Sequence, residues 1–200
     1  MDAWFDPGAV MRSVRVVNVT AVTYVSKPLP LRALAGTLPD STFEPELFAG
    51  LIYHRRCPDA TLIMFSNGRL ASTGARTVSA AIRAIRKTVG EIAIALGSGY
   101  RPGTIRVRNL TAMLQVTGAI DLERLAAEKY GSVEYSPRTF PGLIAKGSNS
   151  TRFLVFSNGK IVCVGAKSRR EILAGLEWLA KCGDGTGSAL PIPSAAVIGT

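Results

Sequence analysis

The sequence predicts an α+β protein built from two tandem homologous repeats, and an internal duplication is the first observation behind this prediction. FSNGRLASTGAR begins at Phe65, and FSNGKIVCVGAK begins at Phe156, 91 residues later. VRVVNVTAV at Val14 matches IRVRNLTAM at Ile105, and FAGLI at Phe48 matches FPGLI at Phe140. Solenoid repeats have shorter periods of about 20–50 residues, so this spacing favours two structural units related by a pseudo-twofold axis.

The second observation is that both repeats have the same predicted order of elements. Residues 14–25 and 104–116 alternate with β-branched side chains, which favours strands. More strands are expected at 48–55, 60–66 and 69–74, and at 140–146, 150–157 and 160–165. Leu, Ala and Ile at helical spacing predict short helices at 29–38 and 120–130, and long amphipathic helices at 77–96 and 168–182.

The domain organisation follows from these elements. The first repeat is expected to span residues 14–96 and the second repeat residues 104–182, joined by a linker at 97–103. Residues 1–13 form an N-terminal tail. Residues 183–200 are rich in Gly, Pro, Ala and Ser and are expected to form a flexible C-terminal tail.

Composition narrows the class of protein. The chain has 24 Lys and Arg against 14 Asp and Glu, a net charge of +10, which attracts polyanions, although a generic basic protein would share it. Its three Cys are widely spaced without a CxxC pair, so neither a disulfide framework nor a zinc site is expected, and a reduced intracellular compartment is favoured. No apolar run reaches the ~18 residues of a membrane span, and the N-terminus does not resemble a signal peptide.

Hairpin geometry decides which side chains share a face of the sheet. A two-residue Asn-Gly loop would place Phe65 opposite Leu70, whereas a three-residue loop at 66–68 would place Phe65 opposite Arg69. The three-residue loop is favoured because Gly68 suits its left-handed position. One face would then hold Ile63, Phe65, Arg69, Ala71 and Thr73 in the first repeat, and Leu154, Phe156, Lys160, Val162 and Val164 in the second.

The alternating pattern makes both faces of this sheet largely apolar. The long helices can cover one face, so the other requires a partner, a second layer or a dimer interface. Each repeat contributes two Phe to this region, Phe48 with Phe65 and Phe140 with Phe156, and Asn18 and Asn109 occur in mid-strand. Core packing could explain any single Phe. Duplicated apolar wedges with amide donors and basic residues suit the minor groove of DNA.

These motifs resemble the TATA-box-binding protein family over residues 14–182. The resemblance rests on VNVT with RNLT, EPELFAGLIY with YSPRTFPGLI, and the paired FSNG…GAR/K segments. It implies a saddle, in which one curved antiparallel sheet has helices on its convex face and DNA against its concave face. This family is itself the reference case for kinking of DNA by Phe wedges.

The resemblance also implies a function. The chain would be a general transcription initiation factor that binds and bends promoter DNA in the nucleus, without enzyme activity or cofactor. Its partners would be IIB-like and IIA-like initiation factors and the RNA polymerase machinery. An enzyme is the least favoured class, because the chain has one His and no P-loop or clustered carboxylates.

The resemblance assigns site residues by position. The groove-facing residues would be Asn18, Thr20, Phe48, Ala49, Ile63, Phe65, Ala71, Thr73, Asn109, Thr111, Phe140, Pro141, Leu154, Phe156, Val162 and Val164. The residues near phosphates would be His54, Arg69, Arg76, Lys146, Lys160 and Lys167. Phosphate contacts position a protein on DNA but carry little sequence information.

Several positions depart from the family pattern. Thr20 and Thr111 stand where Val is usual, Val164 stands where Thr is usual, and Ala71, His54 and Leu47 replace a Val and two basic residues. The second-repeat segment KGSNSTR is shortened. These departures support an alternative, a binding module of the same fold that no longer reads a TATA element and acts mainly through protein contacts.

One further hypothesis concerns the partner end of the molecule. The acidic segment EPELF, expected in the second repeat of this family, begins here at Glu44 in the first repeat. The second repeat instead has EYSPRTF with Arg138. We therefore expect Glu44, Glu46 and Leu47 to contact a IIB-like partner, with parallel loss of charges as the simpler alternative.

Overall fold

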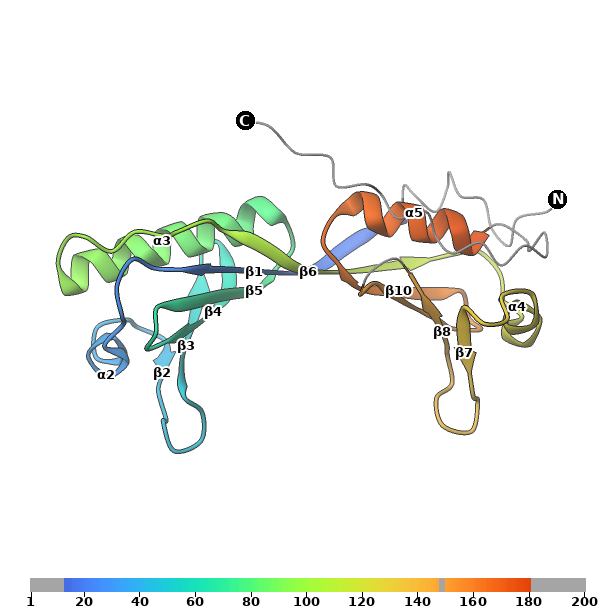
Figure 1. Cartoon of the computed structure of the whole chain (residues 1–200), viewed down its shortest axis with the longest axis horizontal. Helices are drawn as coiled ribbons and strands as arrows, with labels where there is room; N and C mark the ends of the chain where they lie inside the picture. Colours follow the sequence, from blue (N-terminus) through green and yellow to red (C-terminus); the bar gives the residue numbers. More distant parts are fainter. Residues whose placement is uncertain (1–12, 148–149, 181–200) are drawn as a thin grey trace. The chain divides into compact units, whose positions relative to one another are not determined.

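The computed structural model describes residues 13–147 and 150–180 (Figure 1). Most of the predicted N-terminal tail, the whole C-terminal tail and Cys182 lie outside the described residues. Within the described part, no helix is long and apolar enough to cross a membrane.

The described strands form one open antiparallel sheet in the order β2-β3-β4-β5-β1-β6-β10-β9-β8-β7. The strands that precede the linker are β1 (Arg15–Tyr24), β2 (Ser41–Thr42), β3 (Gly50–Arg56), β4 (Asp59–Phe65) and β5 (Arg69–Ala75). Those that follow it are β6 (Arg106–Gln115), β7 (Val133–Tyr135), β8 (Leu143–Lys146), β9 (Arg152–Val155) and β10 (Lys160–Ala166). The predicted α+β class with one antiparallel sheet is confirmed.

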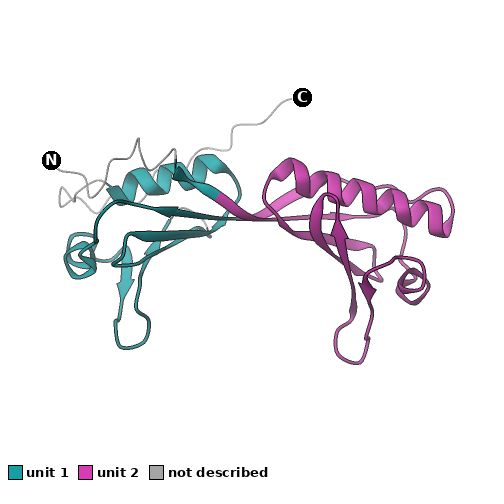
Figure 2. Cartoon of the chain, turned by 180° about the vertical axis from the view of Figure 1, so that it is seen from behind, with its two compact units in different colours: residues 1–15, 111–200 teal, residues 16–110 magenta. Residues whose placement is uncertain are grey.

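The chain divides into two compact units whose boundaries differ from those of the predicted repeats (Figure 2). One unit comprises residues 16–110, and the other comprises residues 1–15 and 111–200. The division falls inside β6, so the first five residues of this strand belong with the first repeat. The repeat boundaries at 96 and 104 stay a prediction.

In the unit of residues 16–110, the long helix α3 (Val78–Leu96) lies along one face of β4 and β5 (Figure 1). The helix begins after Thr77, whose hydroxyl accepts a hydrogen bond of 3.1 Å from the Ala80 N–H, as an N-cap residue does. Leu62, Met64 and Leu70 from the strands are fully buried, as are Ile85 and Ile92 from the helix. The short helix α2 (Leu31–Ala35) buries Leu31 and Leu34.

The other unit has the same layered design. Helix α5 (Arg169–Ala180) packs against β10, and α4 (Leu122–Glu128) lies near β7. The core contains Phe153, Ile161 and Cys163 from the strands, with Ile172 and Leu176 from α5. Burial raises the pKa of the Cys163 thiol to about 12, so this thiol is protonated at neutral pH.

Both hairpins have the predicted three-residue loop. Gly68 has a φ of 84° and donates its N–H to the Phe65 carbonyl at 3.0 Å. Gly159 has a φ of 81° and donates to the Phe156 carbonyl at the same distance. The Met64–Leu70 register therefore places Phe65 opposite Arg69, and the prediction for which side chains share a face is confirmed.

Two predicted strand starts are wrong. We expected strands from Phe48 and Phe140, but β3 begins at Gly50 and β8 at Leu143. The Phe48 N–H donates to the Glu44 carbonyl at 2.9 Å, and the Phe140 N–H donates to Ser136 at 3.0 Å. Each Phe therefore closes a turn before its strand begins. Strands β2 and β7 were not predicted either, because they are too short to show alternation.

The linker is held against the end of β1. The Ser26 hydroxyl donates to the Gly99 carbonyl at 2.8 Å and accepts from the Arg101 N–H at 3.1 Å. The Gly103 N–H donates to the Tyr24 carbonyl at 2.8 Å. Because these contacts lie within residues 16–110, the linker is part of that compact unit.

Candidate nucleic-acid interface

The face of the sheet opposite α3 is half-buried and combines apolar and polar side chains. We call this surface the first open face, and its half-buried residues include Asn18, Thr20, Ile63, Phe65, Ala71 and Thr73. Their neighbours along each strand, such as Val19, Leu62 and Ser72, are fully buried on the helix side. An antiparallel sheet with one face left open in this way can receive a partner.

The second repeat has an equivalent surface, which we call the second open face. Its half-buried residues include Thr111, Leu154, Phe156, Val162 and Val164. Val162 pairs with Leu154, and Val164 pairs with Arg152. Asn109 is half-buried on β6 but belongs to the compact unit of residues 16–110. At the position of Thr73 in the first repeat, the second repeat has Val164.

Each open face ends in a pair of Phe rings. The Phe48 and Phe65 centroids lie 5.9 Å apart with 67° between the ring planes. The Phe140 and Phe156 centroids lie 5.8 Å apart at 64°. Both are edge-to-face contacts, the geometry preferred by the ring quadrupoles. The exposed residues Ala49 and Pro141 follow the first Phe of each pair.

A glycine lies beneath each Phe pair, and neither glycine is among the predicted site residues. A Cβ on Gly50 would lie 2.6 Å from Phe48 Cε1 and 3.2 Å from Phe65 Cε1. A Cβ on Gly142 would lie 2.8 Å from Phe140 Cε1 and 3.0 Å from Phe156 Cε1. The absence of a side chain lets the rings approach the sheet. The repeated FxG in FAGLI and FPGLI was the available signal.

The first open face contains a connected polar cluster. Asn18 Oδ1 accepts hydrogen bonds from the Gly74 N–H at 2.7 Å and from Thr73 Oγ1 at 3.2 Å. Thr20 Oγ1 lies 3.5 Å from Thr73 Oγ1. Gly74 has a φ of 88°, and the β1–β5 register shifts between Val19 and Ala21, as at a β-bulge. The irregular pairing brings the Gly74 N–H to the Asn18 side chain.

Basic residues surround the open faces in different environments. Arg69 is exposed and its guanidinium lies 5.8 Å from the Phe65 ring centroid. Lys146 Nζ lies 2.6 Å from Glu134 Oε1, and this hydrogen bond and charge lower the pKa of the Glu134 carboxyl. His54 Nδ1 lies 3.2 Å from Thr61 Oγ1. Arg76 and Lys167 are exposed and Lys160 is half-buried, so all six predicted phosphate-binding side chains are accessible to some degree.

The acidic loop predicted to bind a protein is exposed. Glu44 and Glu46 are exposed, and Leu47 exposes 82% of its surface. The Glu44 carbonyl accepts from the N–H groups of Leu47 and Phe48, and the Ser136 carbonyl accepts from Thr139 and Phe140 in the same manner. The two loops thus share a backbone turn but place Glu46 and Arg138 at equivalent positions.

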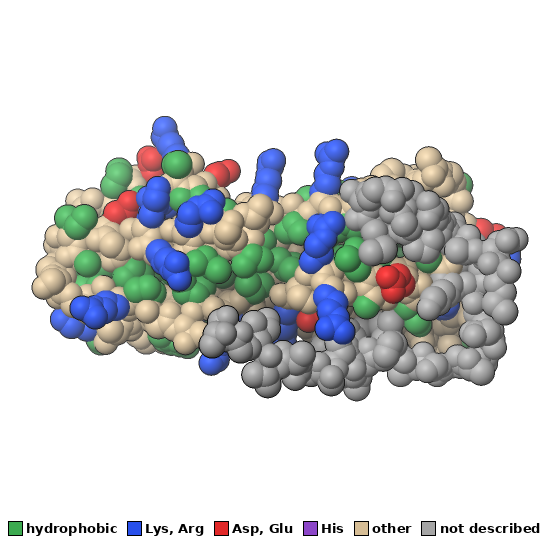
Figure 3. Space-filling model, turned by 90° about the horizontal axis from the view of Figure 1, so that it is seen from above, with side chains coloured by type: hydrophobic (Ala, Val, Ile, Leu, Met, Phe, Trp, Pro, Cys, Tyr) green, Lys and Arg blue, Asp and Glu red, His purple; other side chains and the backbone are tan. Residues whose placement is uncertain are grey.

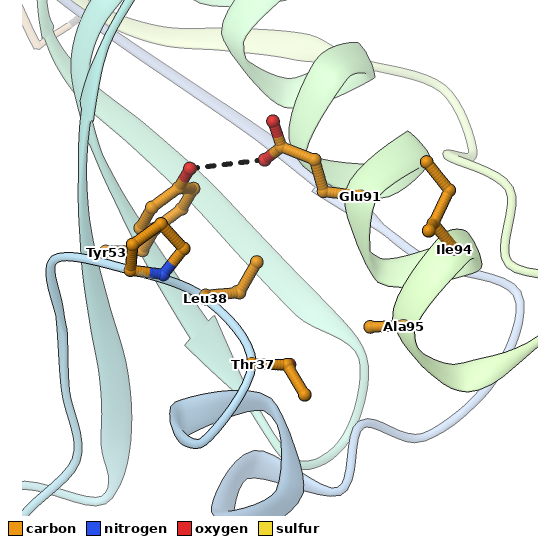
Figure 4. A pocket seen from close by; sticks show the side chains of 7 residues that line it. Thr37, Leu38, Tyr53, Glu91, Ile94 and Ala95 are labelled. Carbon is orange, nitrogen blue, oxygen red and sulfur yellow. Dashed lines mark hydrogen bonds between the residues drawn. The ribbon is translucent and has the colours of Figure 1, made fainter.

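The helix side has a different character. Figure 3 looks onto this side, where Lys and Arg side chains stand among apolar ones. On α3 the exposed basic residues are Arg83, Arg86 and Lys87. A hollow of about 400 Å³ lies between α3 and the segment from Thr37 to Pro39, with Ile94 at its edge (Figure 4).

Tyr53 and Glu91 line this hollow and form a hydrogen-bonded cluster with Arg55. Tyr53 donates to Glu91 Oε2 at 3.3 Å (Figure 4), and Arg55 Nη1 lies 2.8 Å and 2.7 Å from the two Glu91 oxygens. Burial, and then the Glu91 charge, raise the pKa of Tyr53. No group of three or more potential metal ligands occurs in the described part of the chain.

Comparison with known proteins identifies the class. The family model described as "Transcription factor TFIID (or TATA-binding protein, TBP)" matches residues 13–93 and 104–182. A TATA-box-binding protein of Methanobrevibacter smithii is 30% identical over 165 residues, covering 82% of this chain and 91% of the relative. One from Thermoplasma volcanium is 32% identical over 161 residues, covering 80% and 88%.

A solved structure agrees with these sequence matches. "Methanococcus jannaschii TBP" has a TM-score of 0.73 and 28% identity, and the match covers 84% of this chain and 96% of that one. The fold is thus that of a two-repeat transcription factor. The chain belongs to the TATA-binding protein family, so the predicted family, its tandem repeats and its class of transcription initiation factor are confirmed.

Proposed function

We propose that this protein binds promoter DNA in the minor groove through its two open faces and bends it. The observation that supports this most strongly is the duplicated Phe pair, with centroid distances of 5.9 Å and 5.8 Å. Apolar wedges at the edge of an open sheet are suited to entering base steps and unstacking them. One pair at each end of a site would give two kinks.

The polar residues supply hydrogen bonds to base edges. The Gly74 N–H can only donate, so the Asn18 side-chain atom 2.7 Å from it is the oxygen. The Asn18 amide nitrogen therefore keeps its donors for a ligand. Minor-groove edges of A·T pairs present only acceptors, which match these donors.

The remaining proposed contacts follow their positions in the fold. Ala49, Ile63, Ala71, Pro141, Leu154, Val162 and Val164 would pack against sugars and base edges, with Thr20, Thr73, Asn109 and Thr111 as polar members. His54, Arg69, Arg76, Lys146, Lys160 and Lys167 would contact phosphates. These phosphate contacts make the affinity depend steeply on salt.

A second candidate is a module of this fold that acts mainly through protein contacts without reading a TATA element. The hydroxyl of Thr20 on the first open face and the apolar Val164 on the second favour it, because they change which atoms meet the base edges. Under either candidate function, the protein partners would be IIB-like and IIA-like factors and RNA polymerase.

The deciding experiment compares a TATA duplex with a scrambled duplex of equal composition at a fixed, stated salt concentration. Affinity is measured by fluorescence anisotropy and bend angle by energy transfer between the duplex ends. The minor-groove proposal expects a bent complex and preference for TATA. A bent complex without that preference supports the second candidate, and an unbent duplex contradicts the wedge role.

The proposed partner site is the acidic loop of the first repeat. Exposed carboxylates at Glu44 and Glu46 would attract a basic partner, whereas Arg138 would repel it. The test is a gel shift with the cognate IIB-like factor. Glu44→Arg combined with Glu46→Arg should abolish the ternary complex, while Arg138→Glu should preserve it. The opposite result would contradict docking at the first repeat.

The relatives named above come from archaea, whose cells have no nuclear envelope. The nuclear location implied by the family resemblance therefore stays a prediction. Fluorescence microscopy of the tagged protein in cells of its source organism would test this location.

A further inference from the structure

In the polar cluster on the first open face, the donor and acceptor of each hydrogen bond to Asn18 can be assigned. Asn18 Oδ1 accepts both from the Gly74 N–H at 2.7 Å and from the Thr73 hydroxyl at 3.2 Å. A threonine hydroxyl has one proton, so the Thr73 proton is committed to Asn18. What Thr73 can offer to any other neighbour is an oxygen lone pair.

Thr20 is that neighbour. Its Oγ1 lies 3.5 Å from Thr73 Oγ1, which is long for a hydrogen bond between hydroxyls. Within this contact Thr20 is the donor, because the Thr73 proton already goes to Asn18. With its proton turned toward Thr73, the Thr20 oxygen presents lone pairs to whatever covers the open face.

The cluster thus presents two opposite chemistries on one surface. The Asn18 amide presents donors, and Thr20 presents an acceptor. The minor groove offers acceptors at every base pair, but its only donor is the exocyclic amino group of guanine. An acceptor on a groove-facing sheet therefore has one complementary base.

We infer that Thr20 is a specificity-determining residue that accepts a hydrogen bond from a guanine amino group, so the first repeat reads a G·C pair beside the acceptor bound by Asn18. This inference rests on the proposed minor-groove binding. Thr20 is half-buried and so is accessible on this face. Ala71, in the adjoining strand β5, has only a methyl side chain and leaves room beside the row formed by Thr20 and Thr73.

The test replaces guanine by inosine, which lacks the amino group and leaves the major groove unchanged. Starting from a duplex that the full chain binds, each central base pair is set in turn to G·C or I·C. At one pair the wild type should bind G·C about fivefold more tightly, the effect of one net hydrogen bond. Equal or tighter binding of I·C at every pair would overturn the inference.

Substitutions assign the effect to the hydroxyl. Thr20→Val is nearly isosteric and should abolish or reverse the preference, because a methyl group would face the amino group. Thr20→Ser keeps the hydroxyl and should keep the preference. Thr23→Val is the matched control, since Thr23 lies on the same strand but is 2% exposed on the helix side. A preference that survives Thr20→Val would also overturn the inference.

Failure of this inference differs from failure of the proposed function. A bent complex with equal affinity for G·C and I·C at every pair contradicts only the guanine contact. The absence of any bent complex contradicts minor-groove binding and the guanine contact together. Circular dichroism of each variant confirms that the chain is folded before binding is compared.

Discussion

In the first repeat, two Phe rings meet at 5.9 Å above Gly50, and in the second repeat two Phe rings meet at 5.8 Å above Gly142. The hairpin loops share their hydrogen bonds, and both turns before the first Phe close on an equivalent carbonyl. Several polar residues differ instead, although Asn18 and Thr20 are matched by Asn109 and Thr111. Thr73 is matched by Val164, Glu46 by Arg138, and Tyr53 by Ala145. The geometry of the Phe pairs is thus the same in both copies, while part of the polar chemistry differs.

The Phe rings and the surface polar groups differ in how freely they can change. The Phe rings are closely packed against the backbone and against each other. A substitution at one of these positions therefore displaces its neighbours. Hydroxyls and charges at a surface can change singly without disturbing the fold. Two ends with the same ring geometry can therefore differ in the bases or proteins that they would select.

The largest expected effect comes from the Phe pairs, which both repeats share. Phe65→Ala and Phe156→Ala should each weaken DNA binding about tenfold to hundredfold and reduce the bend, because unstacking a base step costs a few kcal/mol that the wedge offsets. Anisotropy and energy transfer measure the two effects. Tyr130→Ala is the control, since Tyr130 is 92% exposed. Wild-type bending in both Phe variants would remove the wedge role.

The glycines beneath the rings give a smaller effect that separates the two ends. Gly142→Ala should weaken binding about threefold to tenfold by displacing its Phe pair. Gly50→Ala should have less effect, because the three atoms nearest its Cβ all belong to movable Phe rings, whereas a Cβ on Gly142 would also lie 3.1 Å from the Val155 carbonyl. Affinity and melting temperature are measured for both.

The matched control for these substitutions is Gly90→Ala, where a Cβ has nothing within 4 Å. Since Gly90 lies inside α3, this change should stabilise the protein by about 0.5–1 kcal/mol and leave binding unchanged. If Gly50→Ala and Gly142→Ala behave like Gly90→Ala, the glycines have no role in seating the rings.

A stability difference between the repeats is expected from the charge cluster below α3. Glu91→Gln should destabilise the unit of residues 16–110 by about 1–2 kcal/mol, because Arg55 is 10% exposed on its side chain and would lose its charged partner. The second repeat has Ala145 and Gly147 where Tyr53 and Arg55 stand. Hydrogen exchange followed by peptide mass measurement should show faster exchange in α3 but not in α5. Equal exchange in both helices would argue against a local clamp.

The smallest effect concerns the Thr73 and Val164 positions. Val164→Thr adds a hydroxyl to the second open face and should raise selectivity for A·T pairs there by at most about 1 kcal/mol. Thr73→Val removes the lone pair that orients the Thr20 hydroxyl and should lower the preference for G·C over I·C under the first repeat by a similar amount. Both are measured over a series of singly substituted duplexes. An unchanged series for both variants would show that this position does not select bases.

Much of the fold could be predicted because the signals were local. Alternation along β4 and β5 separates Ile63 and Phe65 from Leu62 and Met64, and Gly68 in the left-handed position of a three-residue loop sets the hairpin register. The duplication checked each assignment against a second copy. The short strands β2 and β7 could not be predicted, because two or three residues contain too little pattern and depend on pairing with β3 and β8.

Site details that depend on three-dimensional placement were harder to predict. Nothing local distinguishes Gly50 from a turn glycine until the Phe48 ring is placed over it. The orientation of the Asn18 amide follows from an irregular pairing that brings the Gly74 N–H within 2.7 Å. The departure at Thr20 was visible in the sequence, but its proton direction required the Thr73 contact.

The split of β6 between the compact units has a consequence for how such a chain could have arisen. Residues 106–110 complete the unit that otherwise holds the first repeat, and β1 lies between β5 and β6 in the sheet. A single repeat would leave β1 as an open edge with unpaired backbone groups, which favours association with a second copy. Because the linker at 97–103 joins the two repeats, their association is intramolecular, with an effective concentration of the order of millimolar. A covalent tether of this kind makes the pairing of two repeats independent of protein concentration.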